Sequence, residues 1–65
     1  MKVSLLVPAY NERENVEPLL RSFARFIREQ NLDWELVLVD DGSTDGTYEV
    51  AEKLKKRYPF LQLLR

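Results

Sequence analysis

The chain has 65 residues, a formal net charge of −1, and a composition that is 45% hydrophobic and 32% charged. This composition is typical of one small folded domain, or of part of a larger one, rather than of a disordered tail. Cysteine and histidine are absent, which excludes a disulfide framework, a thiolate nucleophile, a Ser-His-Asp triad and a His-ligated zinc site within the chain. The near-neutral charge gives no reason to expect nucleic acid as a partner.

The chain opens with a short apolar segment. Val3 to Val7 is aliphatic and β-branched and is followed by Pro8, so it predicts a first strand that ends there. The segment is too short for a signal peptide or a membrane span, which favours a cytoplasmic protein. No glycine precedes Gly42, and this argues against a dinucleotide-binding G-x-G-x-x-G motif in the loop after this strand.

A first helix is predicted from helical spacing of apolar residues. Asn15 is its predicted N-cap, Pro18 lies in the first turn where no N–H is needed, and the helix should end near Gln30. The apolar stripe consists of Val16, Leu19, Leu20, Phe23, Ala24 and Ile27. Such a stripe is typical of an amphipathic helix lying on a sheet.

A second strand opens into an acidic turn. Leu36 to Val39 is a continuous apolar run, which predicts a strand covered on both faces, as in a parallel sheet. Asp40, Asp41 and Gly42 end the run, and Ser43-Thr44-Asp45 offers three candidate N-caps for a helix that begins near residues 44–46. Ligands bind at such carboxyl ends of strands in open α/β sheets.

The last third of the chain predicts a second helix and a third strand. The helix should be ended by Pro59, and the strand should run from Phe60 to Leu64. The buried stripe of the helix consists of Val50, Ala51, Leu54 and Tyr58. The basic run from Lys53 to Arg57 is interpreted as its solvated face.

These elements predict an α/β fold, a three-stranded parallel βαβαβ unit with strand order 3-2-1. Right-handed crossovers then place both helices on the same face of the sheet. The opposite face would be bare and apolar, which suits a monomer poorly. We therefore expect the remainder of a larger domain, or a second copy of the chain in a homo-oligomer, to cover it.

The two carboxylates after the second strand are candidate binding residues. Neighbouring strand residues point to opposite faces, so Asp40 and Asp41 cannot both reach one ligand, and one of them should support the turn. A carboxylate here could accept the imide N–H of uracil or the N–H groups on the guanine edge. The alternative interpretation is simple turn chemistry, since Asp-Gly pairs commonly follow strands.

The loop after the first strand holds two further candidates. Tyr10 is either a packed aromatic or a platform for a planar base. Glu12 is either a solvated charge or a hydrogen-bond partner for a ribose hydroxyl. Asp45 as a metal ligand lacks a second carboxylate at a suitable spacing, so its predicted role is helix capping.

Two motifs resemble the start of a family 2 glycosyltransferase of the GT-A fold, a Rossmann-like fold. They are Val7-Pro8-Ala9-Tyr10-Asn11-Glu12 and Val39-Asp40-Asp41-Gly42-Ser43-Thr44-Asp45-Gly46-Thr47. The segment Glu12-Arg13-Glu14-Asn15-Val16 is further similar to the polyprenyl-phosphate sugar transferases, the dolichyl-phosphate mannose synthase group. The resemblance covers essentially the whole chain.

The resemblance implies that these loops hold the nucleotide of a UDP- or GDP-sugar. By position, the donor nucleotide would contact Pro8, Ala9, Tyr10, Glu12 and Asp41. Tyr10 would stack on or flank the base, and Asp41 would accept a hydrogen bond from a base N–H. Asp40 matches the motif, but strand alternation gives it a supporting role. Membrane association is expected only of full-length relatives.

The family's D-x-D motif, which binds Mg²⁺ or Mn²⁺, does not occur in this sequence, and neither does the catalytic base of inverting members. We therefore expect residues 1–65 to be a single nucleotide-binding unit, truncated relative to the full domain. It would recognise a nucleotide-sugar donor but not catalyse transfer or bind a cofactor alone. One rival is a minimal βαβαβ folding scaffold without activity. Another is a receiver-like signalling domain, although a phosphoacceptor Asp after a later strand is missing.

Overall fold

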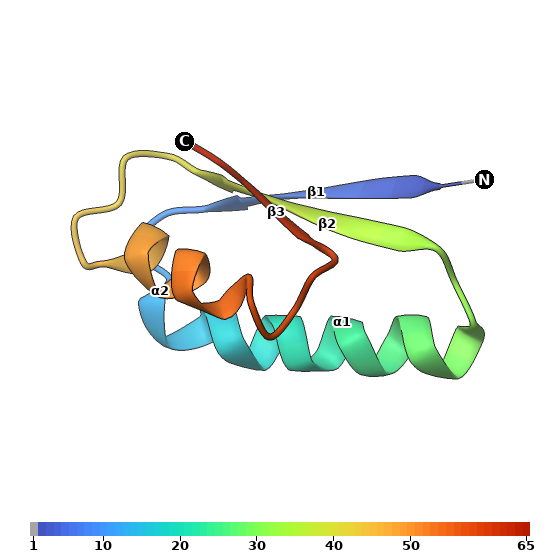
Figure 1. Cartoon of the computed structure of the whole chain (residues 1–65). Helices are drawn as coiled ribbons and strands as arrows, with labels where there is room; N and C mark the ends of the chain where they lie inside the picture. The colour runs from blue at the N-terminus through green and yellow to red at the C-terminus, as the bar shows by residue number, and fades with distance from the viewer. Residues whose placement is uncertain (1) are drawn as a thin grey trace.

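The computed structural model describes residues 2–65 and contains one parallel sheet with helices on one side of it (Figure 1). In chain order the elements are β1 (Val3–Ala9), a 3₁₀ turn η1 (Arg13–Asn15), α1 (Val16–Gln30), β2 (Trp34–Asp40), α2 (Thr47–Leu54) and β3 (Leu61–Leu64). The predicted βαβαβ order is confirmed.

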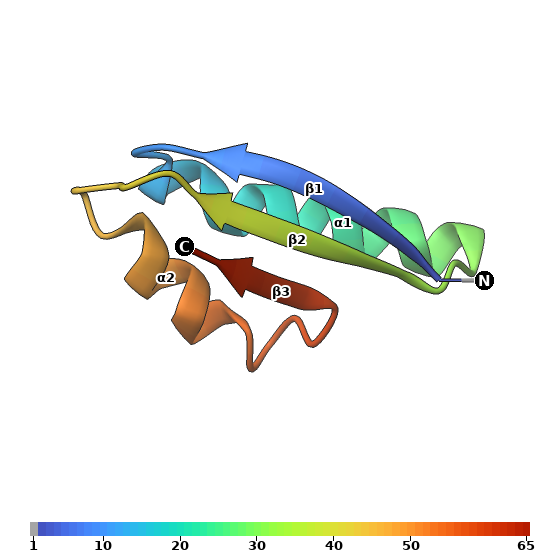
Figure 2. The same cartoon turned by 90° about the horizontal axis from the view of Figure 1, so that it is seen from above.

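β2 is the central strand and pairs in parallel with β1 and with β3. The observed order β1-β2-β3 is the predicted order 3-2-1 viewed from the other edge, and so that prediction is confirmed. The register sets Ala9 opposite Asp40 and Leu64 opposite Val39. All three carboxyl ends therefore lie at the same edge of the sheet (Figure 2).

Both helices cover the same face of the sheet, as right-handed crossovers require (Figure 1). Alternate residues of β2 point into the core, so that Leu36 and Leu38 are fully buried between the sheet and the helices. The apolar core consists of Ala9, Val16, Leu20, Phe23, Leu36, Leu38, Ala51, Tyr58 and Leu61. Phe60 joins its aromatic part, with its ring centroid 5.2 Å from that of Phe23 and 5.8 Å from that of Tyr58.

α1 follows its predicted stripe closely. Asn15 occupies the N-cap position, but its side chain makes no capping hydrogen bond and donates to Glu12 instead. The helix ends where Asn31 adopts a left-handed conformation (φ 54°), a backbone state that asparagine tolerates. The backbone N–H groups of Asn31 and Leu32 then donate to the carbonyls of Arg28 and Ile27, respectively, in the last turn.

Three predicted boundaries are wrong. β1 does not end before Pro8 but continues to Ala9, because an edge strand tolerates the missing N–H of proline. α2 begins at Thr47, later than predicted, and its N-cap residue is Gly46 with φ 92° rather than Ser43, Thr44 or Asp45. α2 also ends at Leu54, well before Pro59, and the intervening residues form a turn.

The face of the sheet opposite the helices is open in this chain. Leu6 and Leu64 point to this face and are 63% and 54% exposed, respectively. Val37 and Val39 lie between them on β2 and are half-buried. The sequence prediction of an uncovered apolar face is therefore confirmed.

Candidate functional site

Two loops meet at the carboxyl edge of the sheet. The first loop (residues 10–15) follows β1 and the second loop (residues 41–46) follows β2, and we call them together the two-loop rim. The backbone N–H of Asn11 donates to Ser43 Oγ at 2.9 Å, and the N–H of Thr44 donates to Asn11 Oδ1 at 2.9 Å. Asn11 makes this exchange from a left-handed conformation (φ 50°). Reciprocal bonds therefore fix each loop against the other.

Thr47, the first residue of α2, is fully buried and joins the same loops. Its hydroxyl accepts the backbone N–H of Glu12 at 3.0 Å and donates to the carboxylate of Asp45. Asp45 also accepts the backbone N–H groups of Arg13 and Thr47, at 3.3 and 3.0 Å. The hydroxyl bond from Thr47 holds the pKa of Asp45 below its usual value. Asp45 therefore acts as a structural acceptor that joins the loops.

The two carboxylates at the end of β2 lie in different surroundings. Asp40 is only 2% exposed, and its Oδ1 accepts the backbone N–H of Ser43 at 3.2 Å. Asp41 is exposed, and its backbone N–H donates to the carbonyl of Ala9 at 2.9 Å, which extends the pairing of β1 with β2. The difference follows from the alternation of side chains along a strand.

Ala9 and Asp40 are partners in the sheet, and they are directly followed by Tyr10 and Asp41, respectively. Tyr10 is 57% exposed. The rim therefore brings an exposed aromatic ring and an exposed carboxylate to equivalent positions after two paired strands.

A cavity of about 230 Å³ lies beside the first loop, between β1 and the start of α1. Its lining residues are Val7, Pro8, Ala9, Glu12, Asn15, Val16, Leu19 and Leu38. Three predicted site residues, Pro8, Ala9 and Glu12, therefore share this cavity, whereas Tyr10 and Asp41 lie outside its lining. Asn15, predicted only as a helix cap, donates its side-chain amide to Glu12 Oε2 at 2.7 Å and so fixes the carboxylate.

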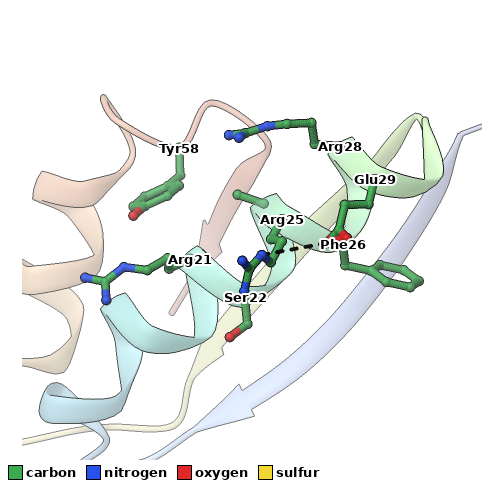
Figure 3. A pocket seen from close by; sticks show the side chains of 8 residues that line it. Arg21, Ser22, Arg25, Phe26, Arg28, Glu29 and Tyr58 are labelled. Atoms are coloured by element: carbon green, nitrogen blue, oxygen red, sulfur yellow. Dashed lines mark ion pairs between the residues drawn. The ribbon is translucent and has the colours of Figure 1, made fainter.

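A larger cavity, of about 580 Å³, lies along α1 beside Tyr58, and we call it the α1 pocket (Figure 3). Its lining residues are Arg21, Ser22, Ala24, Arg25, Phe26, Arg28, Glu29 and Tyr58. Arg25 Nε lies 3.7 Å from Glu29 Oε1, one helical turn away. None of the predicted site residues lines this pocket.

The described residues do not assemble a site for a divalent cation. Within residues 2–65, no three Asp or Glu side chains are grouped so that they could hold a metal ion. Asp40 is buried toward Arg65, and Asp45 is engaged by Thr47. The carboxylates of this chain therefore do not fit the Mg²⁺ or Mn²⁺ that the resemblance implies. Within the same residues, no helix is both long and apolar enough to cross a membrane.

Three lipid-phosphate sugar transferases are among the curated proteins that are similar to this chain. Dolichol-phosphate mannosyltransferase of Pyrococcus furiosus is 48% identical over 59 residues, 91% of this chain and 16% of that protein. Dolichyl-phosphate beta-glucosyltransferase ALG5A of Trichomonas vaginalis is 37% identical and is matched over 95% of this chain and 21% of its own length. Dodecaprenyl-phosphate galacturonate synthase of Rhizobium johnstonii is 45% identical, with 82% of this chain and 16% of that protein covered. The chain spans no more than 21% of the length of these relatives.

A solved structure has the same arrangement of elements. It is the mannosyltransferase PcManGT from Pyrobaculum calidifontis in complex with GDP-Man and Mn²⁺, which is 36% identical and superimposes with a TM-score of 0.62. The match covers 94% of this chain and 17% of that one. The model of glycosyl transferase family 2 matches residues 4–65, a segment that contains both loops of the rim. With these identities, the match shows that the chain belongs to glycosyl transferase family 2.

Proposed function

We propose that residues 1–65 are the nucleotide-recognition half of an inverting glycosyltransferase domain. In this proposal the two-loop rim binds the nucleotide of a UDP- or GDP-sugar, and the chain transfers no sugar alone. The proposal rests on the hydrogen bonds that join the two loops, together with the positions of Tyr10 and Asp41 directly after paired strands. The GDP-Man in the complex of the Pyrobaculum mannosyltransferase supports this class of ligand.

The base of the donor would be held by Tyr10 and Asp41. The exposed ring of Tyr10 offers a flat apolar surface, and stacking of a base on an aromatic side chain contributes about 1–3 kcal/mol. The carboxylate of Asp41 would accept the imide N–H of uracil or the N–H groups of guanine, as a charge-assisted hydrogen bond. Asp40 contributes through the turn, because its Oδ1 is already bonded to Ser43.

The nucleoside would extend from the base toward the cavity beside the first loop. Pro8 and Ala9 contribute apolar lining there, and Glu12 contributes a carboxylate that could accept a ribose hydroxyl. The bond from Asn15 orients Glu12 before any ligand arrives, which lowers the entropy cost of binding. This arrangement assigns each predicted residue a distinct part of the nucleoside.

The rest of a complete enzyme would have to supply the chemistry. There, a hydroxyl or lipid phosphate would attack the anomeric carbon and displace the nucleoside diphosphate. The family resemblance implies an acidic base and a cation site, and within residues 2–65 no group of Asp and Glu side chains could hold the cation. The role of this unit is therefore to orient the donor.

Calorimetric titration with four nucleotides tests this proposal. UDP and GDP each present an N–H donor on the base edge, whereas the matched edges of CDP and ADP present an acceptor at that ring nitrogen. We expect UDP or GDP to bind more tightly than both CDP and ADP, and Asp41→Asn to reduce the difference. Equal binding of all four nucleotides would contradict recognition by Asp41. No binding up to millimolar ligand would contradict the proposal and favour the alternative, a folding scaffold without activity.

We also propose that the open sheet face is covered either by the remainder of a longer domain or by a second copy of this chain. The exposed side chains of Leu6 and Leu64 support this proposal, because monomers rarely leave such apolar patches uncovered. Light scattering on the 65-residue chain should give the mass of a dimer. A well-folded monomer would contradict covering by a second copy.

A further inference from the structure

The carboxylate of Asp40 is incompletely bonded although it is buried. Its side chain is 0% exposed, and Oδ1 has one hydrogen bond, from the backbone N–H of Ser43. Oδ2 has none, and it is the single buried side-chain oxygen or nitrogen in this condition among residues 2–65. Removing a carboxylate from water is unfavourable unless a charge or hydrogen bonds compensate it, so Asp40 needs a partner.

Arg65 is placed to be that partner. Its Nε lies 3.9 Å from Asp40 Oδ2. The ladder of β2 with β3 ends at the pair of Val39 and Leu64, and Asp40 and Arg65 are the next residues after that pair. Opposite charges in cross-strand positions attract each other.

Arg65 is also held from the side of α2. Its guanidinium carbon lies 4.3 Å from the ring centroid of Tyr48, within the range of a cation–π contact. Its Nη2 lies 3.9 Å from Glu49 Oε2. These contacts hold the guanidinium against the first turn of α2 while Nε faces Asp40.

A connected series of polar contacts then runs from β3 to the first loop. Arg65 faces Asp40, Asp40 binds the N–H of Ser43, and the hydroxyl of Ser43 accepts the N–H of Asn11 at 2.9 Å. In the sequence, Asp41 lies between Asp40 and Ser43, and Tyr10 directly precedes Asn11. Movement at Arg65 would therefore reach both residues proposed to hold the base.

We propose that Arg65 is a positioning residue of the two-loop rim. Its charge fixes the buried carboxylate of Asp40, and Asp40 in turn fixes the second loop against the first. Arg65 lies outside both sequence motifs. For its effect on ligands this inference rests on the proposed function, whereas the coupling between Arg65 and Asp40 can be measured without any nucleotide.

A double-mutant cycle on the full chain tests the coupling. The variants are Arg65→Met, Arg65→Lys, Asp40→Asn and the double variant with methionine and asparagine, and the readout is hydrogen exchange of the Ser43 amide. We expect Arg65→Met to accelerate exchange about tenfold and the conservative Arg65→Lys to restore most of the protection. In the Asp40→Asn background, Arg65→Met should have little further effect.

Arg25→Met is the matched control, because Arg25 pairs with Glu29 on α1 away from the rim. It should leave exchange at Ser43 unchanged. A second readout needs no variant of Arg65: its Nε–H resonance in the wild-type spectrum should shift when Asp40→Asn is introduced. Equal effects of Arg65→Met in both backgrounds would overturn the proposal. An unchanged Nε–H resonance would overturn it as well, even if Arg65→Met failed to fold.

Titration of the same variants with GDP and UDP extends the test to ligand binding. We expect Arg65→Met to weaken binding of the preferred nucleotide about tenfold, and Arg65→Lys to weaken it less. Coupling in the exchange cycle with unchanged affinity would overturn the positioning role. Failure of the wild-type chain to bind either nucleotide would reject the proposed function, while the exchange cycle would still decide the coupling.

Discussion

The two-loop rim and the α1 pocket differ in cavity volume and in the number of chain segments that form them. The α1 pocket has a volume of about 580 Å³ against about 230 Å³ beside the first loop. Seven of its eight lining residues come from α1 alone, whereas the rim joins segments that follow β1 and β2. The ion pair between its lining residues Arg25 and Glu29 is local to the helix and exposed. Convergence of separate segments, rather than volume, therefore marks the candidate site.

The largest expected effect on stability comes from removing the buried hydroxyl at the rim. Thr47→Val keeps the shape of the side chain but leaves the Glu12 N–H without its acceptor. It also removes the hydroxyl bond to Asp45 Oδ1, which keeps only the backbone N–H of residue 47. We expect a loss of about 2 kcal/mol in the free energy of unfolding, measured by urea denaturation. Thr44→Val is the control, since Thr44 is exposed and should change stability by less than about 0.5 kcal/mol. Equal losses in both variants would contradict the role of Thr47.

An aromatic truncation compares the two regions directly. Tyr10→Ala should weaken binding of GDP or UDP by about 1–3 kcal/mol, because the base loses its stacking surface. Phe26→Ala removes an exposed aromatic ring that lines the α1 pocket and should leave the affinity unchanged. The measurement is calorimetric titration of the folded variants. A larger effect of Phe26→Ala would transfer the candidate site to the α1 pocket.

The carboxylate that is proposed to bind the base should contribute somewhat less. Asp41→Asn exchanges a charged acceptor for a neutral amide, and we expect about a tenfold weaker affinity for the preferred nucleotide. Asp33→Asn is the matched control, because Asp33 is exposed and precedes β2 at the other end of the sheet. Comparable losses in both variants would indicate a general charge effect.

The pH dependence of stability should report the bonds that Asp45 accepts. Because the pKa of Asp45 in the folded chain lies below its usual value of 3.8, its contribution to stability is present above that value. The contribution is lost as the pH falls through the lower pKa of the folded state. Asp45→Asn should therefore be less stable than the wild type near neutrality, and the difference should shrink in acid. A difference that stays constant through the acid range would contradict this linkage.

The smallest expected effect lies in the α1 pocket. Arg25→Met breaks the exposed ion pair with Glu29 and should change the free energy of unfolding by no more than about 0.5 kcal/mol. It should leave nucleotide binding unchanged. Thermal unfolding measures the effect on stability, and titration measures the effect on nucleotide binding. A strong effect on stability or on binding would show that the α1 pocket is more than a solvated surface.

The sequence was sufficient to predict the order of elements, the helix over Val16–Gln30 and the strand order, because these depend on local periodicity and on the handedness of crossovers. The continuation of β1 through Pro8 was not predicted, since it depends on β1 being an edge strand. The start of α2 was misplaced for a related reason. Ser43 and Thr44 look like caps in isolation, but in the fold they bind Asn11 in the first loop.

The candidate site was predictable only where it carries motifs. Tyr10 and Asp41 lie in those motifs, and parallel pairing of their strands brings the motifs together. The roles of Thr47 and Arg65 depend on contacts between residues far apart in the sequence. No periodicity or spacing in a single sequence reveals such contacts, and so the roles of these two residues emerge only from the structure.

The most direct test of the central claim is nuclear magnetic resonance mapping of the labelled 65-residue chain during titration with GDP and with UDP. The account predicts that the amide resonances of Tyr10 and Asp41 shift together with a single affinity, while those of Arg25 and Phe26 in the α1 pocket stay in place. Shifts confined to the α1 pocket, or no shift at Tyr10 and Asp41 up to millimolar ligand, would contradict it.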